Sequence, residues 1–80
     1  MMESLLTGTP ASRLFRTLLH EDTSMDAWKL DQILIRELPN ISPAASIAIR
    51  RWGSLGSIVI SDEDLDALIS HFLVEAGYAT

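Results

Sequence analysis

Residues 60–77 read ISDEDLDALISHFLVEAG and carry a complete helix signature. Ser61 suits the N-cap, and the three acidic residues after it occupy the first turn, where the helix dipole favours negative charge. Ile60 can form a hydrophobic staple with Leu65, and Gly77 suits the helix end. Apolar residues recur on one face at helical spacing, namely Leu65, Leu68, Ile69, Phe72, Leu73 and Ala76. The stretch therefore predicts an amphipathic helix between Ser61 and Gly77.

Two Ser/Thr-Pro pairs nearer the N-terminus mark two more helix starts. Such a pair places a capping hydroxyl before a proline whose missing N–H has no helical partner. Thr9-Pro10 predicts a helix that ends near Glu21, and Ser42-Pro43 predicts one that ends at Gly53. A further helix is predicted to open at Thr23 or Ser24 and to stop at Pro39, with an apolar stripe of Ala27, Leu30, Leu34 and Leu38.

Four helical segments with short connections predict an all-α fold, either a compact four-helix bundle or an orthogonal helical array. The 80 residues allow one domain, 1–80, and a 48% hydrophobic composition can form a packed core. Residues 1–8 are expected to be a flexible N-terminal tail. The β-branched run at 58–60 could add one short extended segment, although a lone strand has no sheet to join.

The formal net charge of −5 belongs entirely to the last quarter of the chain. Residues 1–60 carry equal numbers of acidic and basic side chains. Residues 61–80 carry no Lys or Arg, and their acidic residues are Asp62, Glu63, Asp64, Asp66 and Glu75. This segment should repel phosphate backbones. It is either a solvated helix face with favourable N-terminal charges or a surface that attracts a basic partner.

The sequence contains no cysteine, which excludes disulfides, thiolate nucleophiles and cysteine-based metal sites. Residues 1–12 lack the basic and apolar regions of a secretory signal. No apolar run approaches the ~20 residues that span a bilayer. We therefore expect a cytoplasmic location and no membrane partner.

Catalytic signatures are missing from the sequence. His20 lies on a polar face near a predicted helix end, and His71 borders the apolar stripe of the last helix. Neither has a recognisable nucleophile or acid–base partner at a diagnostic spacing. The acidic clusters do not match a calcium-binding loop. We therefore expect no enzymatic activity, no cofactor and no metal site.

Surplus apolar side chains on the second and third predicted helices point to protein binding. Trp28 and Ile35 lie seven residues apart and off the main stripe, so they form a second apolar face. Ile47 and Trp52 belong to a helix that is apolar on two sides. Such a surplus is either enclosed in a central helix or exposed at an interface, where tryptophan is often an anchor. The leading hypothesis is a non-enzymatic interaction module of the adaptor, chaperone-like or regulatory kind. It would bind another protein or a second copy through Trp28, Ile35, Ile47 and Trp52.

The alternative is a small regulator that binds DNA in the manner of a helix-turn-helix protein. Its phosphate contacts would be Arg50 and Arg51, the only adjacent basic pair, together with Arg13 and Arg16. A recognition helix normally presents basic or polar residues at its N-terminal end. The last helix would present acidic residues there, so nucleic acid ranks behind protein as a partner.

Overall fold

The computed structural model describes residues 2–53 and 59–78, and within these residues it is all-α, as predicted. The five helices are α1 (Glu3–Leu6), α2 (Ala11–Glu21), α3 (Ala27–Glu37), α4 (Ala44–Trp52) and α5 (Asp62–Glu75). The described chain contains no strand, and residues 59 and 60 have no regular structure. Residue 58, the first of the possible extended segment, lies outside the described residues.

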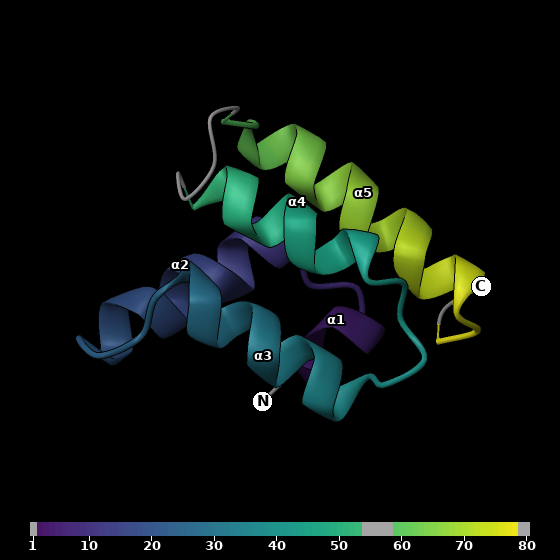
Figure 1. Ribbon diagram of the computed structural model, residues 1–80, viewed down its shortest axis with the longest axis horizontal. Helices are drawn as coiled ribbons and strands as arrows, with labels where there is room; N and C mark the ends of the chain where they lie inside the picture. Colours follow the sequence, from purple (N-terminus) through teal and green to yellow (C-terminus); the bar gives the residue numbers. More distant parts are fainter. Residues whose placement is uncertain (1, 54–58, 79–80) are drawn as a thin grey trace.

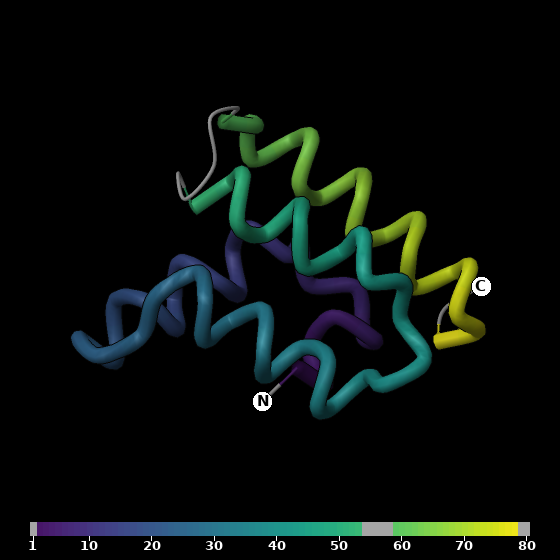
Figure 2. The backbone as a smooth tube through the Cα atoms, in the orientation of Figure 1, coloured from purple at the N-terminus to yellow at the C-terminus, as the bar shows by residue number. Residues whose placement is uncertain are grey.

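Helices α3, α4 and α5 run antiparallel to their chain neighbours and lie side by side (Figure 1). The end of α4 meets the start of α3 at Gly53 and Ala27, and it meets the start of α5 at Trp52 and Asp62. Helix α2 crosses behind this layer and runs antiparallel to α5, as the tube in Figure 2 shows. The short connections predicted by the sequence thus bring consecutive helices into contact.

The predicted apolar stripes form one core. Its most enclosed side chain from α2 is Phe15, which is fully buried and lies 5.9 Å from the Trp52 ring, measured between centroids. The stripe of α3 is buried as predicted, and α4 and α5 contribute their inward faces. The principal buried residues of these three helices are Leu30, Leu34, Ala45, Ala48, Ile49, Leu65, Ile69 and Leu73.

The N-terminal segment differs from the flexible tail expected for residues 1–8. It contains the short helix α1, and both Met2 and Leu5 are buried in the core. The backbone N–H of Met2 donates a hydrogen bond to Glu37 Oε1 at 2.9 Å. A four-residue helix is too short to be stable alone, so its sequence carries little helical signal. Tertiary packing of Met2 and Leu5 therefore explains why the segment is ordered against the core.

The predicted caps agree with the structure at α5 and differ at α3. Ser61 Oγ accepts the Asp64 N–H at 3.1 Å, and Gly77 ends α5 with a φ of 85°, which favours glycine. Helix α3 begins at Ala27, because Asp26 rather than Thr23 or Ser24 is the N-cap and accepts the N–H of Lys29. Ser24 is instead held in a turn, since its N–H and hydroxyl both donate to Asp22 Oδ1.

Gly53 ends α4, but its role differs from that of a left-handed helix terminator. Its φ is −78°, a conformation open to any residue. A Cβ at this position would collide with the Ala27 methyl at the start of α3. Glycine is therefore required here by the close approach of two helix ends.

Gly53→Ala should lower the free energy of unfolding by ~1–3 kcal/mol, because α3 or α4 must shift to relieve the overlap. Adding Ala27→Gly to that variant removes the colliding methyl and should recover part of the loss. Chemical denaturation of the two variants and of Ala27→Gly alone provides the comparison. A neutral or stabilising Gly53→Ala would contradict the close approach, since alanine also restricts the unfolded chain.

Candidate protein-binding surface

The four residues predicted to bind a partner occupy different environments. Trp28, Ile35 and Ile47 are 50%, 40% and 50% exposed, so they are accessible as expected. Trp52 is only 9% exposed, so, contrary to an exposed partner-binding position, little of its side chain is accessible to a partner. Trp28 and Ile35 lie on α3, whereas Ile47 lies on α4 beside α5. The residues predicted to form one binding surface therefore lie on different parts of the protein.

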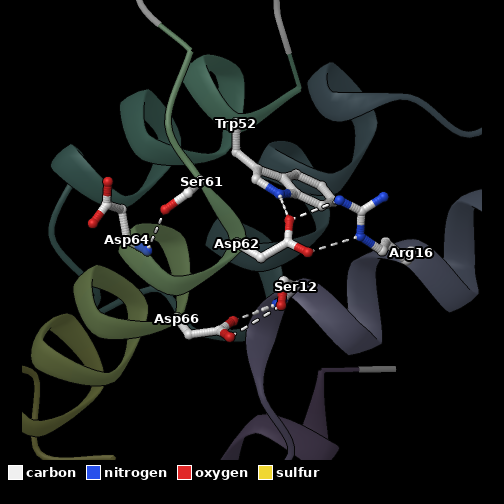
Figure 3. A network of polar contacts seen from close by, with 7 residues as sticks. All are labelled: Ser12, Arg16, Trp52, Ser61, Asp62, Asp64 and Asp66. Carbon is white, nitrogen blue, oxygen red and sulfur yellow. Dashed lines mark hydrogen bonds and ion pairs between the residues drawn. The ribbon is translucent and has the colours of Figure 1, made fainter.

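Trp52 is enclosed because its indole takes part in a joint between three helices, which we call the Asp62 junction (Arg16, Trp52 and Asp62; Figure 3). Trp52 Nε1 donates to Asp62 Oδ1 at 2.8 Å. Arg16 donates to the same carboxylate through Nη2 at 2.7 Å and through Nε at 3.3 Å. The Arg16 guanidinium also lies 5.4 Å from the centroid of the Trp52 ring. One carboxylate thereby links α2, α4 and α5.

A second tryptophan, arginine and aspartate form the Arg50 cluster (Trp28, Asp31 and Arg50) between α3 and α4. Arg50 Nε donates to Asp31 Oδ2 at 2.7 Å, and the Asp31 side chain is only 3% exposed. The Arg50 guanidinium lies 4.5 Å from the centroid of the Trp28 ring. A buried carboxylate needs a charged partner, and that partner also contacts the face of the ring. Trp28 is thus half exposed while one of its faces is already occupied.

Asp66 uses its carboxylate to cap a different helix. Its Oδ1 accepts the Ser12 N–H at 2.7 Å, and its Oδ2 accepts the Ser12 hydroxyl at 3.0 Å (Figure 3). The free N–H of Ser12 at the start of α2 thus binds an acid from α5 instead of Thr9. Asp62 and Asp66 are structural, whereas Glu63 and Asp64 are exposed. The acidic segment is therefore more than the solvated face that its composition suggested.

Two of the four arginines proposed as phosphate contacts bind carboxylates of the protein, and the other two are exposed. Arg16 and Arg50 are bound to carboxylates in the two clusters above. Arg13 and Arg51 are exposed, and neither forms an ion pair with a residue that the structure describes. Half of the candidate nucleic-acid set is therefore engaged within the protein.

The outer surface between α4 and α5 contains an apolar groove of about 290 Å³. We call this the α4–α5 groove, and it is lined by Ala44, Ile47, Ala48, Arg51, Ile60, Leu68 and Phe72. Ala44 and Ala48 form its floor, because their short side chains leave space between the larger lining residues on either side. Ile47 is 50% exposed and Leu68 is 37% exposed. The groove therefore offers apolar side chains to a ligand from two adjacent helices.

A larger cleft of about 810 Å³ lies between residues 5–11 and α5. Its ionisable lining residues are Asp66 and Tyr78, and both are already hydrogen-bonded. Asp66 binds Ser12, and the Tyr78 hydroxyl accepts the Asn40 N–H at 3.0 Å. Each of these two groups therefore already has a hydrogen-bond partner within the protein.

The histidines lie away from that cleft. His20 is exposed near the end of α2, and His71 Nε2 lies 3.3 Å from Glu75 Oε2 on the outer side of α5. Across residues 2–53 and 59–78, no group of three or more His, Cys, Asp or Glu side chains could hold a metal ion.

Comparisons of the chain with protein-family models, curated proteins and solved structures find no match. Among the described helices, none has the length and apolar character needed to cross a membrane.

Three residues that line the groove were not predicted from the sequence to bind a partner. Leu68 and Phe72 were assigned to the core stripe of α5, and Ile60 was assigned to the staple. The structure leaves Leu68 exposed and Phe72 partly exposed. The signal was the width of the α5 stripe, which holds more apolar residues than one inward face can bury.

Because Phe72 is only partly buried, its truncation should cost less than the ~3–5 kcal/mol of a fully buried phenylalanine.

The Asp62 junction predicts a dependence of stability on acidic pH. Hydrogen bonds from Arg16, then from Trp52, lower the pKa of Asp62 below its ordinary value. A lowered folded-state pKa stabilises the protein above the unfolded pKa of about 4, and this contribution is lost as pH falls through the folded value. Asp62→Asn should therefore be less stable than wild type at neutral pH, with a difference that shrinks below about pH 4.

Urea denaturation from neutral to acidic pH measures this difference. Glu63→Gln is the matched control, because Glu63 is an exposed acid of the same helical turn and forms no ion pair with a described residue. It should stay close to wild type at neutral pH. A constant gap between wild type and Asp62→Asn down to the lowest pH would argue against the junction.

Proposed function

We propose that this chain is a non-enzymatic protein-binding module that contacts its partner through the α4–α5 groove. The observation that carries this proposal is the joint exposure of Ile47 and Leu68 in one groove with an alanine floor. Apolar side chains that share a surface depression favour association, whereas scattered exposed apolar residues need no explanation. A groove between two helices also suits the insertion of side chains from a partner helix.

The volume of the groove supports a protein ligand over a small molecule. About 290 Å³ is at the lower limit of the ~300–1,000 Å³ common for small-molecule pockets. Its lining offers one charged group, Arg51, among apolar side chains. Such a surface lacks the several convergent polar groups that orient a substrate or cofactor. The DNA-binding alternative gains no support from the arginines, because Arg16 and Arg50 are bound to Asp62 and Asp31.

Site-specific photo-crosslinking in the cells that produce this protein tests the proposal. A photoreactive residue at position 47 should form an adduct with a protein, which is either another species or a second copy. Adding Leu68→Glu to the same chain should abolish that adduct, because a charge would be placed in the groove. Both side chains are partly exposed, so the substitutions should change stability by less than roughly 1 kcal/mol.

Ile35→Glu is the matched control, since Ile35 is similarly exposed but lies on α3 outside the groove. It should leave the adduct at position 47 intact. An adduct that survives Leu68→Glu, or one that Ile35→Glu removes equally well, would show that the groove is not the contact surface.

A further inference from the structure

We infer that the partner seated in the α4–α5 groove is a second copy of this chain, related by a two-fold axis parallel to α4 and α5. This inference rests on the proposed function, because it names the occupant of the same groove. It is carried by the distribution of charge on the two rims and by the direction of the two helices.

The two rims of the groove carry opposite charge. Arg51 lies four residues after Ile47, so it shares the exposed face of α4. Asp64 lies four residues before Leu68 and shares the exposed face of α5. Figure 3 shows the Asp64 carboxylate directed away from the Asp62 junction. Neither side chain forms an ion pair within the described parts of the chain, so each is available to an external partner.

These two charges lie at the same level along the groove. Helices α4 and α5 are antiparallel, and the hydrogen bond between Trp52 and Asp62 fixes their relative position. Arg51 therefore lies next to the start of α5, and Asp64 lies in the first turn of that helix, about one turn before the lining residue Leu68. Ile47 and Leu68 are likewise on opposite rims, about one helical turn further along.

A two-fold axis parallel to the helices places α4 of each copy on α5 of the other. Arg51 of one copy then faces Asp64 of the second, and the second pair follows by symmetry. The same operation places Ile47 on Leu68 in both directions. A two-fold axis across the groove would instead lay α4 on α4 and α5 on α5 with reversed direction, so Arg51 would face neither Asp64. The rim charges therefore select one of the two symmetric arrangements.

The selected arrangement is an antiparallel four-helix bundle made of two α4–α5 hairpins. In such a bundle each helix has antiparallel neighbours, so the helix dipoles are also favourably paired. The alanine floor formed by Ala44 and Ala48 would lie near the centre, where small residues permit close approach. The exposed groove is short, so we expect a weak dimer with a dissociation constant in the micromolar range.

Sedimentation velocity at low ionic strength, over about 5–500 µM protein, tests this arrangement. The wild type should show a reversible monomer–dimer equilibrium. Arg51→Glu and Asp64→Lys should each weaken the dimer by roughly tenfold or more, because each places like charges face to face twice. The double variant Arg51→Glu/Asp64→Lys should restore association, since the two rims then attract with reversed signs.

Glu63→Lys is the matched control for charge, because Glu63 is an exposed first-turn acid that does not share the Leu68 face of α5. It should leave the dimer unchanged, and circular dichroism should confirm that every variant remains helical. A chain that stays monomeric over the whole range would overturn the inference. A dimer that the double variant fails to restore would also overturn it. In either case, loss of a different protein's adduct in Leu68→Glu would leave the proposed function standing.

Discussion

The Asp62 carboxylate accepts hydrogen bonds from an arginine of α2 and a tryptophan of α4 while it begins α5. Each donor needs this acceptor for a separate reason. The enclosed indole N–H of Trp52 would otherwise lack a partner, and Arg16 stacks on the same ring that Asp62 orients. A chain of 80 residues buries a limited apolar surface, so a joint that fixes three helices at once constrains the whole arrangement.

The same joint determines where the outer surface of the protein can form. With Trp52 turned inward against Phe15 and Asp62, α4 presents its opposite side to solvent. That side carries Ile47 and Arg51, and the fixed position of α5 brings Leu68 beside them. The groove is therefore a consequence of the internal hydrogen bonds and of the two alanines in its floor. Trp28, which is exposed elsewhere on the surface, is partly covered by the Arg50 guanidinium.

Local rules account for the parts of the fold that the sequence predicted. The Ser61 cap, the Gly77 terminus and the buried Leu30/Leu34 stripe depend on residues within a few positions of one another. The all-α class follows from such local signals, because every long helix has its own apolar periodicity. Helix α1 was not predicted, because a four-residue helix is stabilised only by packing against distant residues. The start of α3 was placed too early, because Ser24 looks like an N-cap in the sequence but is bound to Asp22 in a turn.

Long-range pairing explains what the sequence could not predict about the surface. Arg16 and Asp62 are 46 positions apart, and no periodicity connects them. Trp52 was therefore assigned to the surface, although its neighbours in space enclose it. Ile47 was proposed as a partner contact and is exposed, but its companions in the groove come from α5 and depend on how that helix is rotated. The α5 stripe was wide enough to serve both the core and a surface, yet only the packed structure assigns Leu68 outward.

Asp62 fixes the inner sides of α4 and α5, and we propose that their outer sides form a self-complementary groove. The most direct measurement is an isotope-filtered nuclear Overhauser experiment on an equal mixture of labelled and unlabelled chains at high concentration. The proposed dimer should give intermolecular signals between the methyl groups of Ile47 in one copy and those of Leu68 in the other. Intermolecular signals confined to Trp28 or Ile35, or none at all, would contradict it.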